Sequence, residues 1–144
     1  MKIKRAFPLS RTTYKKCMEE SAKRNENNDC AVKAVAIAGR VTYDLAHQTL
    51  EMYGRRHRKG TSVGAIAAAF MSIQASMIEI DRDKLIKRNG GRTLTVNNIV
   101  QHLSKSKNYV LYIAGHILAV KNGQVQDWTE GRRHHVTSIY EIVR

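Results

Sequence analysis

The segment Cys30–Ala38 constrains the fold of this chain more than any other, because its side chains are small and apolar on almost every side. A helix with such a sequence has no polar face to turn toward water and is expected at the centre of the domain. Asn28 or Asp29 is the expected N-cap, which places Cys30 in the first helical turn. Gly39 is expected to end the helix.

The pattern of the chain changes near residue 108, from helical segments before that point to strands after it. This order predicts an α+β domain, in which N-terminal helices with a central Cys-bearing helix pack on a C-terminal antiparallel sheet. Further helices are expected over residues 12–24, 43–53, 63–73 and 96–103, and a weak strand over 76–80. Strands are expected over residues 109–114, 116–121, 124–128 and 136–143.

The charge of the chain is strongly positive and unevenly spread. Its 144 residues, enough for one domain over 1–144, include 25 Lys and Arg against 12 Asp and Glu, a formal net charge of +13. Such a balance attracts nucleic acid, anionic lipid or an acidic protein, so we expect the basic groups to be exposed and to bind an anionic partner. Much of the excess lies in a basic N-terminal segment, residues 1–24, and in a second run with Arg55, Arg56, Arg58 and Lys59.

The sequence also limits where the chain works and what it holds. No apolar run is long enough to span a membrane, and the basic start, Met1–Arg5, lacks the apolar stretch of a secretory signal. Two cysteines, Cys17 and Cys30, cannot form a disulfide framework, so a reduced, cytoplasmic setting is expected. His134 and His135 would face opposite ways on a strand, so no metal site is expected, and no cofactor.

Three residues together indicate nucleophilic chemistry. Cys30 begins the buried helix, where the helix dipole and free N–H groups favour a thiolate. His116 begins a strand of the C-terminal sheet and can act as general base and acid. Asp127 lies near the end of the next strand and can fix the tautomer of the imidazole.

The predicted hairpin brings His116 and Asp127 onto one face of the sheet. Asn122-Gly123 is a strong signal for a two-residue turn, and counting outward from it pairs Leu118 with Asp127 and His116 with Thr129. Asp127 is then a diagonal neighbour of His116, about 7–8 Å away at the backbone and within side-chain reach.

These motifs resemble the papain-like cysteine peptidase superfamily, in particular small, uncharacterised phage and bacterial members of it. The resemblance covers residues 25–143 and implies a papain-like fold with Cys30 as nucleophile, His116 as base and Asp127 as the orienting residue. It also implies the host cytoplasm as the location if a phage encodes the chain. The residues that carry it are Asn28–Ala34, Tyr43-Asp44, Gly54–Arg56, Lys59–Thr61, Tyr109–Leu111, Gly115-His116, Ala119-Val120, Gly123 and Asp127-Trp128.

One position departs from that superfamily, which usually places a glutamine several residues before the cysteine as an oxyanion donor. No glutamine precedes Cys30 in this chain. Asn28 and Asn25 carry the same donor group on a shorter side chain, and we take them as the candidate oxyanion donors.

Two functions remain open for this pattern. The first is a cysteine hydrolase that cleaves a peptide or isopeptide bond in a protein or peptide substrate. The second is a catalytically inactive binding module that docks its basic surface on nucleic acid or on an acidic host protein. In the second case Cys30 is only a small buried residue of an Ala-rich helix. Thiol reactivity separates the two, since a catalytic Cys30 would be alkylated well below the normal thiol pKa.

Overall fold

The structure is a computed structural model that describes residues 9–144; Lys2, Lys4 and Arg5 of the predicted basic segment lie outside the described residues. The first half of the described chain forms helices α1 (Tyr14–Lys23), α2 (Cys30–Ala38), α3 (Tyr43–Met52) and α4 (Val63–Ser72). The middle forms strand β1 (Ser76–Glu79) and the short helices α5 (Arg82–Arg88), α6 (Val96–Ile99) and η1 (Val100–His102), the last a 3-10 helix. The last part forms strands β2 (Asn108–Ile113), β3 (His116–Lys121), β4 (Gln124–Gln126) and β5 (Ser138–Val143).

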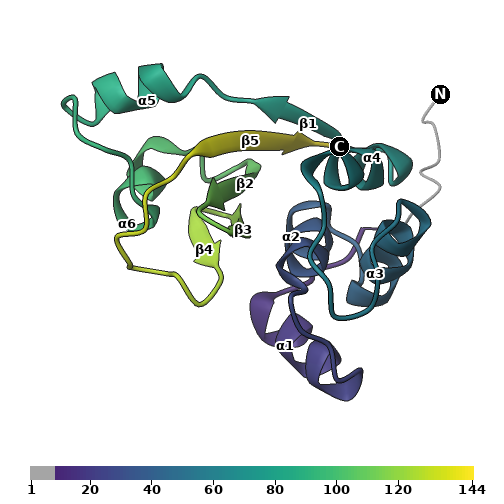
Figure 1. The fold of residues 1–144 in the computed structure, drawn as a ribbon. Helices are drawn as coiled ribbons and strands as arrows, with labels where there is room; N and C mark the ends of the chain where they lie inside the picture. The colour runs from purple at the N-terminus through teal and green to yellow at the C-terminus, as the bar shows by residue number, and fades with distance from the viewer. Residues whose placement is uncertain (1–8) are drawn as a thin grey trace.

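All strands of the described chain belong to one antiparallel sheet, in the order β1-β5-β2-β3-β4. Three of the four pairings join strands from the C-terminal third, and the fourth places β1 along β5, with Ser76 opposite Val143. The prediction of a mixed α+β fold with an antiparallel sheet is confirmed. Strand β1, which follows α4, forms one edge of that sheet (Figure 1).

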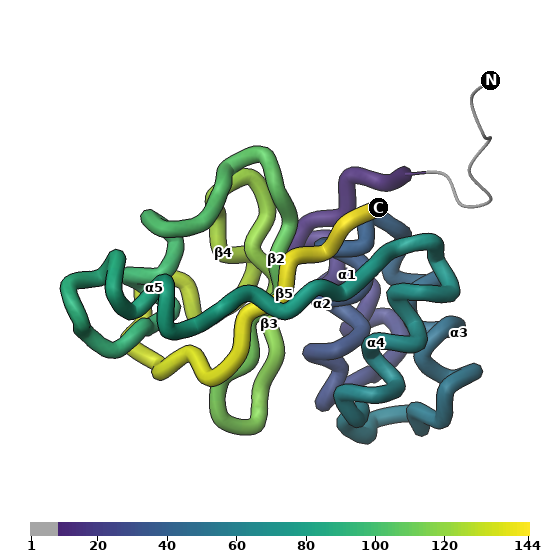
Figure 2. Tube along the Cα trace, turned by 90° about the horizontal axis from the view of Figure 1, so that it is seen from above, coloured from purple at the N-terminus to yellow at the C-terminus, as the bar shows by residue number. Residues whose placement is uncertain are grey.

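The sheet is covered on both faces, and the alternation of its side chains shows how. In β2, Val110 packs in a cluster with α2, α3 and α4, whereas Tyr109 and Leu111 pack in a second cluster with α5 and α6. Figure 2 shows α5 on one side of the sheet and α1, α2, α3 and α4 on the other. Because both faces are apolar, β2 and β3 lack the polar alternation of a half-exposed strand.

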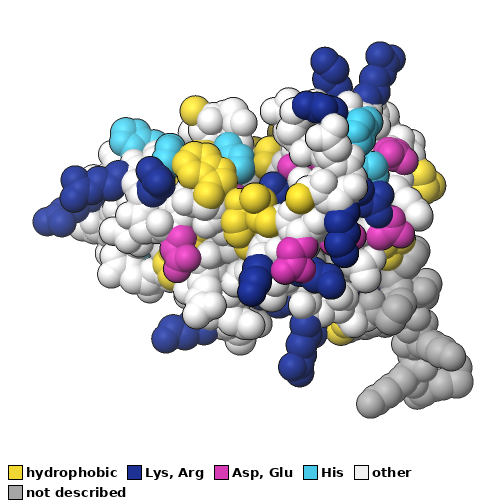
Figure 3. Space-filling view, turned by 90° about the horizontal axis from the view of Figure 1, so that it is seen from below, with side chains coloured by type: hydrophobic (Ala, Val, Ile, Leu, Met, Phe, Trp, Pro, Cys, Tyr) yellow, Lys and Arg dark blue, Asp and Glu magenta, His cyan; other side chains and the backbone are white. Residues whose placement is uncertain are grey.

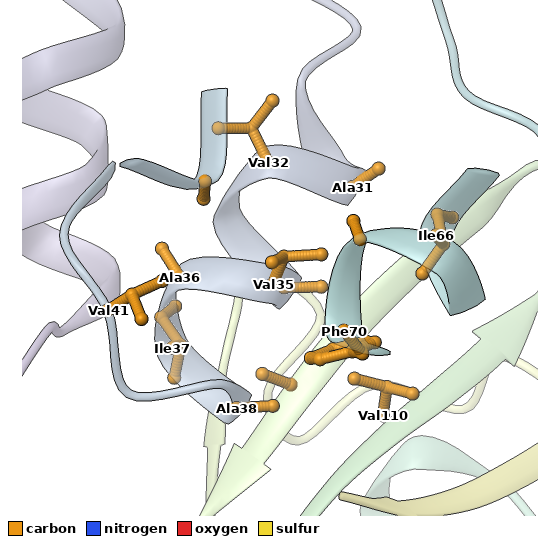
Figure 4. Close-up of a cluster of buried hydrophobic side chains, with 14 of the residues drawn as sticks. Ala31, Val32, Val35, Ala36, Ile37, Ala38, Val41, Ile66, Phe70 and Val110 are labelled. Atoms are coloured by element: carbon orange, nitrogen blue, oxygen red, sulfur yellow. The ribbon is translucent and has the colours of Figure 1, made fainter. Parts of the chain in front are cut away.

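Helix α2 lies between the sheet and the other N-terminal helices, as its sequence predicts (Figure 1). Every α2 residue except Cys30 and Lys33 is buried. Its side chains pack in one cluster with Ile117 and Ala119 of β3. Phe70 of α4 lies in the same cluster, near Val35 (Figure 4). Burial of this helix fixes Cys30, its first residue, next to the start of β3.

Gly39 follows α2 for a reason other than a left-handed backbone. Its φ is −80°, and Arg40, the next residue, adopts the left-handed conformation at φ 58°. A Cβ on Gly39 would lie 2.4 Å from the backbone carbonyl oxygen of Val35 and 2.7 Å from the Cδ1 atom of Ile73, so these close approaches require glycine here. The predicted end of the helix is correct, and glycine is needed there for packing.

Four helices begin with the side-chain caps expected of Ser and Thr. Thr13, Thr42, Ser62 and Thr95 each accept a hydrogen bond from a backbone N–H in the first turn. Asp29 occupies the N-cap position of α2 but makes no such bond. The backbone N–H groups at the start of α2 are therefore not occupied by the Asp29 carboxylate.

The sequence patterns predict the long elements well and the short ones less well. Helix α5 was not predicted, because its seven residues include five charged ones and bury only Leu85. The hairpin register is confirmed over the pairs from Lys121–Gln124 to Ala119–Gln126. Strand β4 then stops at Gln126, so the predicted pairing of Leu118 with Asp127 is wrong. Within residues 9–144, no helix has the length and apolar character needed to cross a bilayer.

Candidate active site

The thiol of Cys30 lies at the first turn of α2, next to the start of β3. Hydrogen bonds reach it from His116 and from two backbone N–H groups, those of Ala31 and Ile117. Ala31 belongs to α2, whereas His116 and Ile117 belong to β3. The packing of α2 on β3 therefore creates the contact between the thiol and the imidazole.

His116 connects Cys30 to a buried carboxylate. Its Nε2 atom lies 2.9 Å from Oδ2 of Asp127, whose side chain is only 5% exposed. Since Nε2 is engaged by Asp127, Nδ1 is the ring nitrogen that remains for the thiol of Cys30. The structure thus brings together the three residues that the sequence singled out, in the order thiol, imidazole, carboxylate.

Thr129 holds the Asp127 carboxylate in place. Its hydroxyl donates to Oδ2 of Asp127 at 2.7 Å, and its backbone N–H donates to the same oxygen at 3.2 Å. Thr129 is fully buried. Asp127 contacts His116 from the turn that follows β4. The sequence predicted instead that Asp127 would lie within the strand, opposite Leu118. Sequence reasoning placed Thr129 opposite His116 and did not assign it this role.

The hydrogen bonds of the site lower the pKa of Cys30 and raise that of His116, so both shifts favour the charged forms. Burial alone raises the pKa of the Cys30 thiol, but the hydrogen bonds from His116 and the backbone outweigh burial and hold that pKa below its ordinary value. Burial lowers the pKa of His116, but its hydrogen bonds to Asp127 and Cys30 raise it to about 9. Between these two pKa values, a thiolate and an imidazolium are the favoured forms.

An exposed aromatic side chain stands beside the imidazole. Trp128 is 51% exposed, and its ring centroid lies 5.5 Å from that of His116. The guanidinium of Arg132 lies 5.7 Å from the Trp128 ring centroid, and the His134 ring meets it edge-on at 5.5 Å. The outer side of the site is therefore formed by a Trp ring with basic groups around it.

Helix α1 fixes the turn that carries Asp127. The backbone N–H of Tyr14 donates to Oε1 of Gln126 at 3.0 Å, and the Tyr14 hydroxyl accepts a hydrogen bond from the backbone of Trp128. Burial, followed by the charge of Asp127, raises the pKa of Tyr14. These contacts join α1 to Gln126 and Trp128, the residues on either side of Asp127.

The candidate oxyanion donors lie in the loop before Cys30. The amide of Asn28 donates to the carbonyl of Arg58 at 3.2 Å, and the backbone N–H of Asn25 donates to the carbonyl of Ala22 at 3.1 Å. Both asparagines have a left-handed backbone, at φ 50°. The Asn28 amide is thus directed toward the 54–60 loop. The N–H groups that reach the sulfur are those of Ala31 and Ile117.

A buried ion pair locks the loop before Cys30, and it overturns one prediction. Arg55 was expected in the exposed basic run, but its side chain is fully buried against Glu26, with a guanidinium nitrogen 3.1 Å from Oε1. Two charges so deeply buried stabilise the fold only as a pair, and Arg55 cannot contact an anionic partner. Arg56, Arg58 and Lys59 are exposed as predicted.

The basic N-terminal segment is mostly exposed where the structure describes it. Arg11, Lys15, Lys16 and Lys23 are exposed, whereas Arg24 is partly buried and pairs with Asp44 of α3. The face of the molecule seen from below has hydrophobic side chains near its middle and Lys and Arg side chains at several places around them (Figure 3).

Two histidines share the Glu26 carboxylate with Arg55. Oε2 of Glu26 lies 2.7 Å from Nε2 of His47 and 3.0 Å from Nδ1 of His57. Burial raises the pKa of Glu26, but the hydrogen bonds from Arg55 and His47 lower it to about 2. Among residues 9–144, this is the one group of three side chains whose ligand atoms are close enough to hold a metal ion. Arg55 already neutralises the carboxylate, so we interpret the group as an ion-pair network. His47 is buried within this group.

Comparison with known proteins adds no family to this geometry. The chain matches no family model, no curated protein and no solved structure. The arrangement of side chains is therefore the basis for assigning a function.

Proposed function

We propose that the protein is a papain-like cysteine hydrolase that cleaves a peptide or isopeptide bond. The observation that carries the proposal is the continuous chain of hydrogen bonds from the Cys30 thiol through His116 to the buried Asp127. Each member has the environment its role needs: the thiol lies at a helix N-terminus, the imidazole contacts both partners, and the carboxylate is buried and fixed by Thr129.

The chemistry follows from these positions. The Cys30 thiolate attacks the carbonyl carbon and forms a C–S bond. The protonated His116 gives its proton to the departing nitrogen as the C–N bond breaks, which leaves a thioester on Cys30. The imidazole then takes a proton from water, whose oxygen attacks the thioester. The C–S bond breaks, the acid product leaves and the thiolate returns.

The developing oxyanion needs donors close to the sulfur. In the proposal these are backbone N–H groups at the start of α2, starting with that of Cys30 itself, because the Asp29 carboxylate does not cap them. Asn28 can contribute only if its amide leaves the carbonyl of Arg58, and Asn25 is the second candidate. Asp127 keeps the proton-bearing Nε2 of His116 oriented and stabilises the imidazolium.

A direct test is alkylation of Cys30 with iodoacetamide in a pH series, together with hydrolysis of an amide-linked fluorogenic peptide library. Alkylation of Cys30 at neutral pH, with loss of peptide hydrolysis in Cys30→Ala, supports the proposal. A Cys30 that reacts only near the ordinary thiol pKa contradicts it. That result favours the alternative, an inactive module whose exposed Arg56, Arg58 and Lys59 serve an acidic protein or nucleic acid.

A further inference from the structure

A cavity of about 790 Å³ lies at the C-terminal end of α2, the end opposite Cys30. It is bordered by Ala38 at the end of α2 and Arg40 after it, by the segment 11–13, and by the ends of β3 and β5. None of the three candidate catalytic residues lines it. It is therefore a separate site.

The charged side chains around this cavity are almost all basic. The single carboxylate among them, Glu141, is paired with Lys107 at 3.1 Å. Arg144 donates to the carbonyl of Gly39 at 2.7 Å. That leaves three cations, Arg11, Arg40 and Lys121, which have no carboxylate partner among residues 9–144. We refer to these three as the pocket cations.

The pocket cations act on one another. Burial is the first cause that lowers the pKa of Lys121, and the positive charges of Arg40 and Arg11 lower it further. Like charges thus face one another across the cavity, which costs Coulomb energy in the unliganded protein. An anion bound between them would remove that repulsion and would gain attraction to all three.

We propose that this cavity binds a phosphate group. Two guanidinium groups offer the planar pairs of donors that match phosphate oxygens, and Lys121 adds a compact charge. A phosphate monoester carries nearly two negative charges and three acceptor oxygens, which suits three cations better than a single carboxylate does. Asn122 and Gln124, in the turn and strand beside Lys121, add neutral donors at the rim.

The phosphate can come from a free nucleotide or from the backbone of a nucleic acid. Both offer the same chemistry to the pocket cations, but they differ in how affinity changes with ligand length. A nucleic acid would extend beyond the cavity, so its affinity would rise with length and fall with salt. A nucleotide that fits the cavity would bind with little gain from added length.

The test uses the full chain and three probes: ATP, a fluorescent oligothymidylate, and a glutamate peptide of equal charge. The pocket variant is Arg11→Gln/Arg40→Gln/Lys121→Gln. The matched control is Arg56→Gln/Arg58→Gln/Lys59→Gln, which removes the same charge from the exposed loop. We expect the pocket variant to weaken binding of the phosphate probe by more than about tenfold. With the oligonucleotide, the slope of log K against log salt should decrease by about 2.

The control variant should change affinity far less than the pocket variant, and both should keep the wild-type rate of Cys30 alkylation. Arg11→Gln alone, at an exposed position, gives a partial loss and guards against misfolding of the triple variant. Competition by ATP as strong as that by the oligonucleotide identifies the source as a nucleotide, and weak competition identifies it as nucleic acid. Equal losses in the two triple variants, or equal competition by the glutamate peptide, would overturn the proposal.

Discussion

Nε2 of His116 lies 2.9 Å from Oδ2 of Asp127, and that oxygen also accepts both the hydroxyl and the backbone N–H of Thr129. Three donors therefore converge on one carboxylate oxygen beside the sheet. The arrangement fixes the imidazole from the side away from Cys30 and leaves Nδ1 toward the thiol. It also makes the charge state of Cys30 depend on a residue that does not contact it.

The first prediction is that Asp127→Asn shifts the alkylation of Cys30 to higher pH. The wild-type thiol should react at lower pH than an ordinary cysteine, because its pKa lies below the ordinary value. Removing the carboxylate takes away the main interaction that raises the pKa of His116, so the imidazolium that stabilises the thiolate is lost near neutrality. The measurement is the rate of iodoacetamide labelling between pH 5 and 10, followed by mass spectrometry.

Cys17 is the internal control for that experiment. It is completely buried, and burial raises its pKa to about 12. It should remain unlabelled in the folded protein across this pH range and become reactive only in denaturant. Equal pH profiles for wild type and Asp127→Asn would show that the carboxylate does not control the thiol.

Thr129→Val should weaken both the fold and the site. The substitution keeps the shape of the buried side chain but removes the hydroxyl that donates to Asp127. We expect a loss of about 1–3 kcal/mol in the free energy of unfolding, since one buried hydrogen bond disappears. Thr129→Ser retains the hydroxyl and should keep the alkylation profile of Cys30. Urea unfolding measures the first effect, and a Val variant as stable and as reactive as the Ser variant would contradict it.

The site shows which features the sequence could predict. Cys30 at a helix start and His116 at a strand start follow from local patterns, since a run of small apolar residues and an Asn-Gly turn each have one strong interpretation. The contact of Asp127 with His116 was expected from a longer strand, whereas the chain turns after Gln126 and Thr129 redirects the carboxylate. The proximity is as predicted, but a different local structure produces it.

The burial of Arg55 could not be predicted, because it belongs to the run Arg55–Lys59, which is basic throughout and carries no apolar residue. Its partner Glu26 lies far away in sequence, and the pair forms only when the 54–60 loop folds against the segment before α2. Periodicity describes one segment at a time. Contacts between two loops leave no periodic signal, which is also why the Glu26–His47–His57 group was missed.

Glu26→Gln should be strongly destabilising, because it leaves the buried guanidinium of Arg55 without a counter-charge. We expect a loss of about 3–5 kcal/mol in the free energy of unfolding. Glu20→Gln is the matched control, since Glu20 pairs at 3.4 Å with an exposed Lys23, and its loss should cost less than about 1 kcal/mol. Thermal and urea unfolding of both variants measure the difference. Similar losses in the two variants would mean that Arg55 finds water or another acceptor.

Gly39→Ala should destabilise the junction between α2 and α4. The new Cβ would lie 2.4 Å from the carbonyl oxygen of Val35 and 2.7 Å from Cδ1 of Ile73, so the end of α2 and the Ile73 side chain must both shift, at a cost of about 1–3 kcal/mol. Gly64→Ala is the control, because open space surrounds Gly64 in α4; it should stabilise by about 0.5 kcal/mol. Opposite signs in urea unfolding are the expected result, and a neutral Gly39→Ala would contradict the close packing.

The last prediction concerns the pH dependence of stability. Burial opposes the charge of His116, but its bonds to Asp127 and Cys30 raise the folded-state pKa from 6.5 to about 9. The folded protein then binds this proton more tightly than the unfolded chain. The stabilisation is fully present below about pH 6.5 and is lost as pH rises through about 9.

A Cys30→Ser background isolates the contribution of the carboxylate to that dependence, because it removes the titrating thiol. In this background, Asp127→Asn should lower the melting temperature clearly at pH 6 and much less at pH 10, where His116 is neutral in both proteins. Some difference should persist at pH 10, since the neutral imidazole and Thr129 still donate to the carboxylate. His135→Gln, at an exposed histidine, should leave the melting curves unchanged at both pH values. A difference between Asp127→Asn and its parent that stays constant from pH 6 to pH 10 would mean that His116 is uncharged in the folded protein, and the thiolate of Cys30 would then lack its counter-ion.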